Sequence, residues 1–205
     1  MNHGLVYLVD DDAAIRDALA WLLLSRGIQS NAWNSAESFL ADYKPEMSGC
    51  LILDIRMTGM TGTKLHDQLL ALGCAMPVIF LTGHGDVPLA VKALKRGAFD
   101  FIEKPLNDNE LVDRVIEALK LEESRRWRDA DRAEVAAHLA TLTEREREVM
   151  AGVLAGKLNK VIADELQIAM RTVEVHRSRI FEKMGVRSAV ELAQRLSAHA
   201  STGSR

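Results

Sequence analysis

The sequence predicts two domains of different fold class: an α/β domain with a parallel sheet, followed by an all-α domain of four helices. Over residues 1–119, short continuous apolar runs alternate with helix-spaced apolar residues, which is typical of a parallel sheet covered on both faces. From residue 141 onward only helical spacing occurs. The length of 205 residues, with 48% hydrophobic and 27% charged side chains, allows two modest globular domains and excludes general disorder.

In the first domain, most expected strands are short apolar runs and the expected helices have apolar residues at helical spacing, with a weaker strand signal at 28–33 and a weaker helix signal at 36–43. The expected strands lie at residues 5–9, 28–33, 50–53, 78–81 and 99–102. The expected helices lie at residues 15–22, 36–43, 87–94 and 111–119, and Asp12 is expected to cap the first of them.

A charged linker is expected at residues 120–140, between a first domain at 1–119 and a second at 141–205. Ten of the fifteen residues from 120 to 134 are charged. The linker contains neither Gly nor Pro, so we expect it to be helical rather than a flexible tether.

The second domain carries start and stop signals for its helices. Thr143 with Glu146 forms the pattern of a capping box, and Asn159 is expected to cap a second helix. A third helix is expected from about residue 170 to 184 and ends at Gly185. Ser188 is expected to cap a fourth.

Charge and cysteine content narrow the function classes. Residues 1–119 hold ten basic against sixteen acidic side chains, whereas residues 141–205 hold eleven against eight, which indicates modules with different partners. Two cysteines exclude a disulfide scaffold, and the spacing of a zinc site is absent. No apolar run approaches the roughly 18 residues of a membrane span, and the first residues do not resemble a signal peptide. We therefore expect a cytoplasmic protein with no membrane partner.

Polar side chains follow the expected strands at their carboxyl ends. These residues are Asp10, Asp11, Asp54, Thr82 and Lys104. In an open α/β sheet of order 2-1-3-4-5, that edge forms the ligand site, and the three carboxylates would share a small space. Their repulsion predicts a hard divalent cation, Mg²⁺ or Mn²⁺, bound by oxygen ligands. Such a site beside a lysine and a hydroxyl suits a phosphoryl group on a carboxylate, and Asp54 is the expected nucleophile.

These residues, in this order and spacing, resemble the receiver domain of two-component response regulators over residues 4–120, and the stretch 82–88 resembles the FixJ-like branch. The resemblance implies a flavodoxin-like (βα)5 fold and phosphorylation of Asp54 by a sensor histidine kinase. It implies that the backbone carbonyl of Arg56 joins Asp10, Asp11 and Asp54 as a metal ligand. Thr82 and Lys104 would contact the phosphoryl oxygens.

Two further positions are informative within that resemblance. Phe101, with Thr82, would act as the conformational switch. Thr58 occupies a position where the family usually has proline, a departure that removes no functional group from the pocket.

The third helix of the second domain has one face suited to the major groove. Glu can accept a hydrogen bond from cytosine and Val can contact a thymine methyl, while basic and hydroxyl side chains hold phosphates. The sequence segments around Thr143, Asn159 and Arg171 resemble the LuxR/FixJ/NarL helix-turn-helix domain over residues 141–198. The expected DNA contacts are Lys160, Arg171, Thr172, Glu174, Val175, His176, Ser178, Arg179 and Lys183.

Together the two resemblances imply a DNA-binding response regulator of the FixJ/NarL type, not an enzyme beyond taking up and losing its own phosphoryl group. Phosphorylation would promote a homodimer that controls transcription at promoter DNA with RNA polymerase. Two alternatives stay open. One is a Mg²⁺-dependent phosphotransferase whose second domain docks a protein, and the other is a transcription factor regulated by a small ligand that binds the first domain.

Overall fold

The computed structural model describes residues 4–83 and 87–200, and the chain divides into two compact units between residues 126 and 127. Residues 84–86, part of the stretch that resembles the FixJ-like branch, lie outside the described residues. Among the helices of the described ranges, none combines the length and apolar character needed to cross a membrane.

The first unit contains a five-stranded parallel sheet of order β2-β1-β3-β4-β5, which confirms the predicted fold and is the strand order on which the expected site depends. Its strands are β1 (Leu5–Val9), β2 (Ser30–Trp33), β3 (Gly49–Asp54), β4 (Val78–Thr82) and β5 (Asp100–Glu103). Its helices are α1 (Ala13–Ser25), α2 (Ala36–Asp42), α3 (Gly62–Ala71), α4 (Val87–Lys95) and the first part of α5 (Asp108–Ala140).

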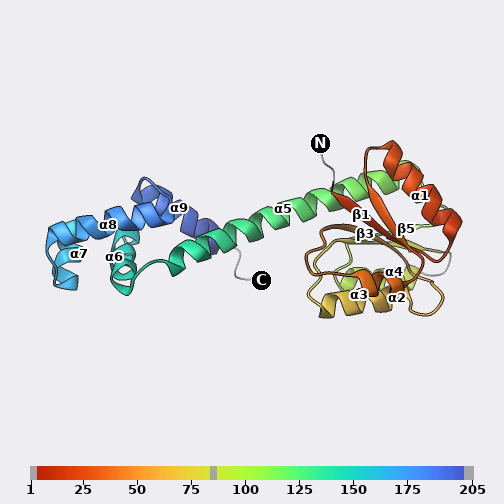
Figure 1. The fold of residues 1–205 in the computed structure, drawn as a ribbon, viewed down its shortest axis with the longest axis horizontal. Coiled ribbons are helices and arrows are strands. Elements are labelled where there is room, and N and C mark those ends of the chain that lie inside the picture. The colour runs from red at the N-terminus through yellow and green to blue at the C-terminus, as the bar shows by residue number, and fades with distance from the viewer. Residues whose placement is uncertain (1–3, 84–86, 201–205) are drawn as a thin grey trace. The chain divides into compact units, whose positions relative to one another are not determined.

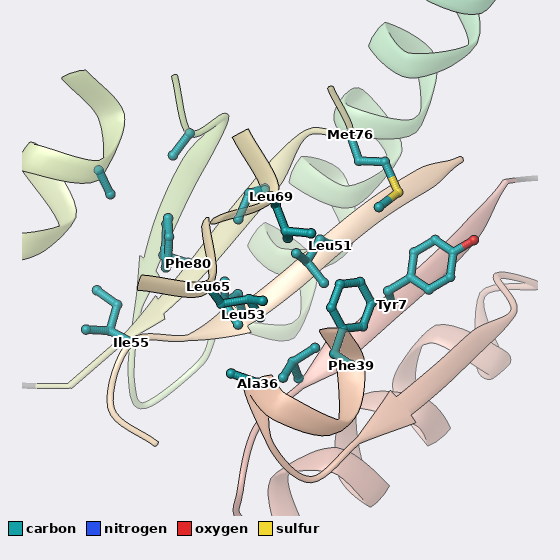
Figure 2. Packing of buried hydrophobic residues seen from close by; sticks show 14 of the residues in the cluster. Tyr7, Ala36, Phe39, Leu51, Leu53, Ile55, Leu65, Leu69, Met76 and Phe80 are labelled. Atoms are coloured by element: carbon teal, nitrogen blue, oxygen red, sulfur yellow. The ribbon is translucent and has the colours of Figure 1, made fainter. Parts of the chain in front are cut away.

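Helices cover both faces of this sheet, with α1 and α5 on one side and α2, α3 and α4 on the other (Figure 1). One apolar cluster joins Leu19 and Leu23 of α1 to Leu111 and Val115 of α5. The other cluster centres on Phe39, which packs beside Tyr7 and Leu51 (Figure 2). Burial on both faces explains why the central strands β1, β3 and β4 are continuous apolar runs in the sequence.

Helix α3 is an element that the apolar spacing did not mark. Its buried face consists of Leu65, Leu69 and the histidine His66, whose ring lies edge-on to Phe80 at 5.5 Å between centroids. Burial lowers the pKa of His66, which favours the neutral ring. A polar residue type on the inner face hid this helix from a search for apolar periodicity.

Helix α5 continues without interruption through residues 120–140. Its residues up to Arg126 belong to the first unit, where Arg125 donates a hydrogen bond to the backbone carbonyl of Ala75 and Arg126 donates one to Ser48 Oγ at 2.8 Å. Arg125 also forms an ion pair with the buried Glu122 at 2.7 Å. These contacts pack this stretch of helix against the first unit.

The second unit contains the end of α5 and four further helices among its described residues, α6 (Glu144–Leu154), α7 (Asn159–Leu166), α8 (Met170–Met184) and α9 (Ala189–Ala200). The capping box of Thr143 and Glu146 is confirmed, and so is the end of α8 at Gly185, which has a positive φ of 62°. Ser188 accepts a hydrogen bond from the backbone N–H of Glu191, as expected of a cap.

The prediction that Asn159 caps the second of these helices is wrong. The cap position is Leu158, whose backbone is extended, and Asn159 is the first helical residue. No side chain of the described residues caps α7. An asparagine can accept the free N–H groups only from the cap position, and here it lies one residue too late.

Candidate functional site

The polar residues at the strand ends meet at one edge of the sheet. In the strand register Val9 is paired with Leu53 and Asp54 with Leu81, so Asp10 lies beside the end of β3. On the other side Thr82 is paired with Glu103, and the backbone N–H of Lys104 donates a hydrogen bond to the Thr82 carbonyl at 2.7 Å. Parallel pairing thus gathers side chains that are far apart in the sequence.

Lys104 joins the carboxylates of two neighbouring strands. Its Nζ lies 2.6 Å from Asp54 Oδ1 and 3.0 Å from Asp10 Oδ2. The side chains of Asp54 and Asp10 are only 8% and 3% exposed, so this contact is shielded from water. Two carboxylates share one ammonium group, which leaves an excess of negative charge in the pocket.

The pKa values of this pair follow from burial and from that contact. Burial raises the pKa of Asp54, against the hydrogen bond and charge of Lys104, which lower it. For Lys104, burial acts to lower the pKa, but the hydrogen bonds and charges of Asp54 and Asp10 outweigh it, so the pKa is raised. Lys104 therefore stays positively charged, and its single charge does not neutralise both the Asp54 and the Asp10 carboxylates.

Asp11 lies away from this pair. Its Oδ2 accepts hydrogen bonds from the backbone N–H and the hydroxyl of Thr58, at 2.8 and 2.9 Å. Across residues 4–83 and 87–200, no three His, Cys, Asp or Glu side chains are grouped so that they could hold a metal ion. The structure therefore joins Asp10 and Asp54 through Lys104, whereas Asp11 is held by Thr58, a contact that was not anticipated.

The donor set nevertheless fits a hard divalent cation. The carboxylates of Asp10 and Asp54 exceed the single ammonium between them in charge, and carboxylate oxygens are the ligands that Mg²⁺ prefers. Arg56 follows two residues after Asp54, and its backbone N–H donates a hydrogen bond to the Asp54 carboxylate. That hydrogen bond ties the loop after β3 to the pocket.

Thr82 brings a hydroxyl without a partner to this edge. The residue is fully buried, and its Oγ1 forms no hydrogen bond with any group of the described residues. Phe101, on the adjacent strand, is half-buried and packs against the apolar cluster under α2, α3 and α4. A buried hydroxyl without a hydrogen-bond partner is available to form a hydrogen bond with a ligand.

In the second unit, α8 separates the predicted faces. Val173, Ile180 and Met184 are fully buried, as expected of an inward face. The residues expected to contact DNA are exposed at Arg171, Thr172, Val175, Ser178 and Arg179, and half-buried at Glu174 and His176. Lys160 is exposed on α7, and Arg171 forms an ion pair with Glu174 at 2.8 Å.

Lys183 differs from the other predicted DNA contacts. Its Nζ lies 2.7 Å from Glu146 Oε2 and donates a hydrogen bond to the Thr141 carbonyl at 3.0 Å. The Glu146 side chain is only 3% exposed. The sequence marked Glu146 only as half of a capping box, because nothing in local spacing links it to a lysine 37 positions later.

The comparisons with known proteins agree with this architecture. Residues 6–116 match the family described as "Response regulator receiver domain", and residues 140–196 match "Bacterial regulatory proteins, luxR family". The C4-dicarboxylate transport transcriptional regulatory protein DctR of Rhodobacter capsulatus is 52% identical over 191 residues, which cover 92% of this chain and 97% of DctR. The transcriptional regulatory protein FixJ of Bradyrhizobium diazoefficiens is 43% identical over 194 residues, which cover 94% of each chain.

Solved structures show the same similarity. The response regulator StyR superimposes with a TM-score of 0.89 and 39% identity over 95% of this chain and 98% of StyR. Full-length FixJ from B. japonicum superimposes with a TM-score of 0.61 and 40% identity over 99% of this chain and all of FixJ. The relatives are transcriptional regulators, so the expectation of a regulator rather than an enzyme is confirmed, and its two domains imply a cognate histidine kinase and promoter DNA as partners. The chain is a member of the FixJ-like, LuxR-type family of two-component response regulators.

Proposed function

We propose that Asp54 accepts a phosphoryl group from a sensor histidine kinase and that this modification controls DNA binding by the second unit. The observation that carries the proposal is the contact of Lys104 with both Asp54 and Asp10, at the same sheet edge as the unpartnered hydroxyl of Thr82. A nucleophile, a cation and a free hydroxyl are the groups that a phosphoryl acceptor site requires.

In this proposal an Asp54 oxygen forms a bond to phosphorus as the bond between phosphorus and the donor breaks. The Lys104 ammonium and the Thr82 hydroxyl then bind the phosphoryl oxygens, which replaces the shared contact of Lys104 with Asp10. The side chains of Asp10, Asp11 and Asp54 and the backbone carbonyl of Arg56 would hold Mg²⁺ or Mn²⁺. When bound, the cation neutralises charge that develops on the transferred group.

The same step would set the conformational switch. Once the Thr82 hydroxyl turns toward the phosphoryl group, it leaves space beside β5 into which Phe101 can turn. A phosphoryl group can only shift an equilibrium between states that already exist, and it does so by this difference in contacts. We infer that the altered surface of α4, where Val91, Lys92 and Lys95 are exposed, pairs two receiver domains.

A receiver dimer would present two copies of α8 to paired DNA half-sites. In this proposal Glu174 and Val175 read bases, and Lys160, Arg171, Thr172, His176, Ser178 and Arg179 supply the other contacts with DNA, whereas Lys183 is engaged by Glu146 and Thr141. We take residues 1–119 as the receiver, 120–140 as the linker and 141–205 as the DNA-binding domain. We also propose that the protein acts in the cytoplasm and has RNA polymerase at the promoter as a partner.

Labelling with acetyl phosphate tests the acceptor. Wild-type protein should take up one phosphoryl group only when Mg²⁺ is present, and Asp54→Asn should take up none. Asp12→Ser is the matched control, because Asp12 caps α1 by accepting the Ala14 N–H and a serine keeps that cap. Full labelling of Asp54→Asn would refute the assignment of the acceptor.

A further inference from the structure

Thr58 makes two hydrogen bonds to a single oxygen of Asp11. Both donors come from the same residue, the backbone N–H at 2.8 Å and the hydroxyl at 2.9 Å. Thr58 lies in the loop after β3, 47 positions from Asp11, so the contact ties the loop that follows the acceptor to the loop that follows β1.

The residue type at position 58 decides whether this contact can form. Threonine and serine offer a backbone N–H and a hydroxyl from one position. Valine keeps the N–H and loses the hydroxyl, whereas proline has neither donor. The contact is therefore a property of this sequence that single substitutions can remove in steps.

Asp11 in this arrangement does not join Asp10 and Asp54, and within the described residues no group of three such side chains is ready to hold a metal. A cation that uses Asp11 as a ligand needs a lone pair of the carboxylate and a carboxylate that is free to orient. The two hydrogen bonds from Thr58 occupy Oδ2 and hold the carboxylate in one orientation, so a cation that takes Oδ2 must displace them. When only a fraction of the protein molecules is in the binding-competent state, the apparent affinity of the ligand is lowered by that fraction.

We propose that Thr58 competes with the divalent cation for Asp11 and thereby weakens cation binding in the pocket. This inference rests on the proposed function, in which Asp11 is a ligand. The hydrogen bonds from Thr58 also lower the pKa of Asp11, and a cation likewise favours the ionised carboxylate. The competition is therefore for the orientation and lone pairs of Asp11, not for a proton.

The test is Mn²⁺ binding by the unphosphorylated full chain, measured from the electron paramagnetic resonance signal of free Mn²⁺ during titration with manganese chloride. Thr58→Pro removes both donors and should tighten binding about tenfold, which corresponds to about 1.4 kcal/mol for the two hydrogen bonds together. Thr58→Val removes one donor and should tighten binding by about threefold. Thr58→Ser keeps both and should stay within about twofold of the wild type.

Asp11→Ala separates failure of this inference from failure of the proposed function. If Asp11→Ala weakens Mn²⁺ binding while Thr58→Val and Thr58→Pro bind as the wild type does, the competition is refuted and the cation site stands. If Asp11→Ala binds Mn²⁺ like the wild type, Asp11 is not a ligand, and both this inference and the proposed role of Asp11 in the cation site are refuted. Weaker binding by Thr58→Val would mean that Thr58 supports the ligand, which also overturns the inference. Should Thr58→Pro fail to fold, Thr58→Val decides alone.

Discussion

The Lys183 ammonium group lies 2.7 Å from the buried Glu146 carboxylate, which also accepts the backbone N–H of Thr143 in the capping box at the start of α6. Two elements of the second unit, α6 and α8, are thus joined through one carboxylate. The hydrogen bond from Lys183, followed by the one from Thr143, lowers the pKa of Glu146 to about 2. A buried, charge-assisted contact of this kind supports the fold directly.

Replacement of Glu146 by glutamine should destabilise the second unit in a pH-dependent manner. Because the folded-state pKa is depressed to about 2 from an ordinary 4.5, the ionised carboxylate contributes stability that is fully present above about pH 4.5. That contribution, on the order of 3 kcal/mol, is lost as the pH falls from about 4.5 to about 2. Urea denaturation of wild type and Glu146→Gln between pH 7 and pH 3 measures the difference.

The control for that experiment is Glu148→Gln. Glu148 forms an ion pair with Arg145, but both side chains are about 40% exposed, at 43% and 39%, so the pair should contribute less than about 1 kcal/mol. A difference between wild type and Glu146→Gln that stays constant from pH 7 to pH 3 would contradict the assigned pKa.

Lys183 and Arg179 should differ in their effect on DNA binding. Arg179 is exposed on α8, so Arg179→Gln should reduce the slope of log affinity against log salt by about 1, the loss of one phosphate contact. The Lys183 ammonium is engaged with Glu146 and Thr141, so Lys183→Gln should leave that slope unchanged but lower the free energy of unfolding. DNA titrations at several salt concentrations separate these roles. A reduced slope in Lys183→Gln would restore this lysine as a phosphate contact.

Thr82→Val should separate stability from regulation. The Thr82 hydroxyl is buried and has no partner among the described residues, so a methyl group in its place should raise the free energy of unfolding by about 1 kcal/mol. The variant should still be labelled at Asp54, but phosphorylation should no longer increase its affinity for DNA.

Thr61→Val is the contrasting variant for Thr82→Val. The Thr61 hydroxyl caps α3 by accepting the Lys64 N–H, so its loss should destabilise the protein by about 1 kcal/mol and leave regulation intact. Thermal unfolding and DNA titration are the two measurements. A Thr82→Val protein that gains DNA affinity on phosphorylation as the wild type does would remove Thr82 from the switch.

Lys95→Glu should prevent the gain in DNA affinity on phosphorylation while leaving the labelling of Asp54 intact. Lys95 is exposed on α4, on the surface proposed to pair two receivers, and linking two DNA-binding modules can raise avidity by about 10²–10⁴. Lys64→Glu, an equal charge change on the exposed side of α3, is the control. Sedimentation beside DNA titration provides the readout. A phosphorylated wild type that stays monomeric at micromolar concentration yet binds DNA more tightly would exclude the dimer mechanism.

Much of the first unit followed from the sequence because its three central strands, β1, β3 and β4, are buried on both faces. Continuous apolar runs identified the central strands, and the residues at their ends, Asp54 among them, were therefore expected at one edge. Helix α3 was not predicted, because its inner face contains His66 beside only two leucines and so lacks a clear apolar periodicity. Asn159 was wrongly predicted as the cap of α7. The cap position and the first helical residue are adjacent in the sequence, and residue type alone does not show which of the two positions Asn159 occupies.

The sequence by itself determined the alternation of strands and helices, the polar residue types at the strand ends and the two faces of α8, since each depends on residue type and on local spacing along the chain. The tertiary structure alone decided which partner each charged group takes. Lys104 is shared by Asp10 and Asp54, Lys183 is bound by Glu146, and Asp11 is held by Thr58. These partners lie 37 to 94 positions apart along the chain, and only the packing of strands, loops and helices brings them within hydrogen-bond distance.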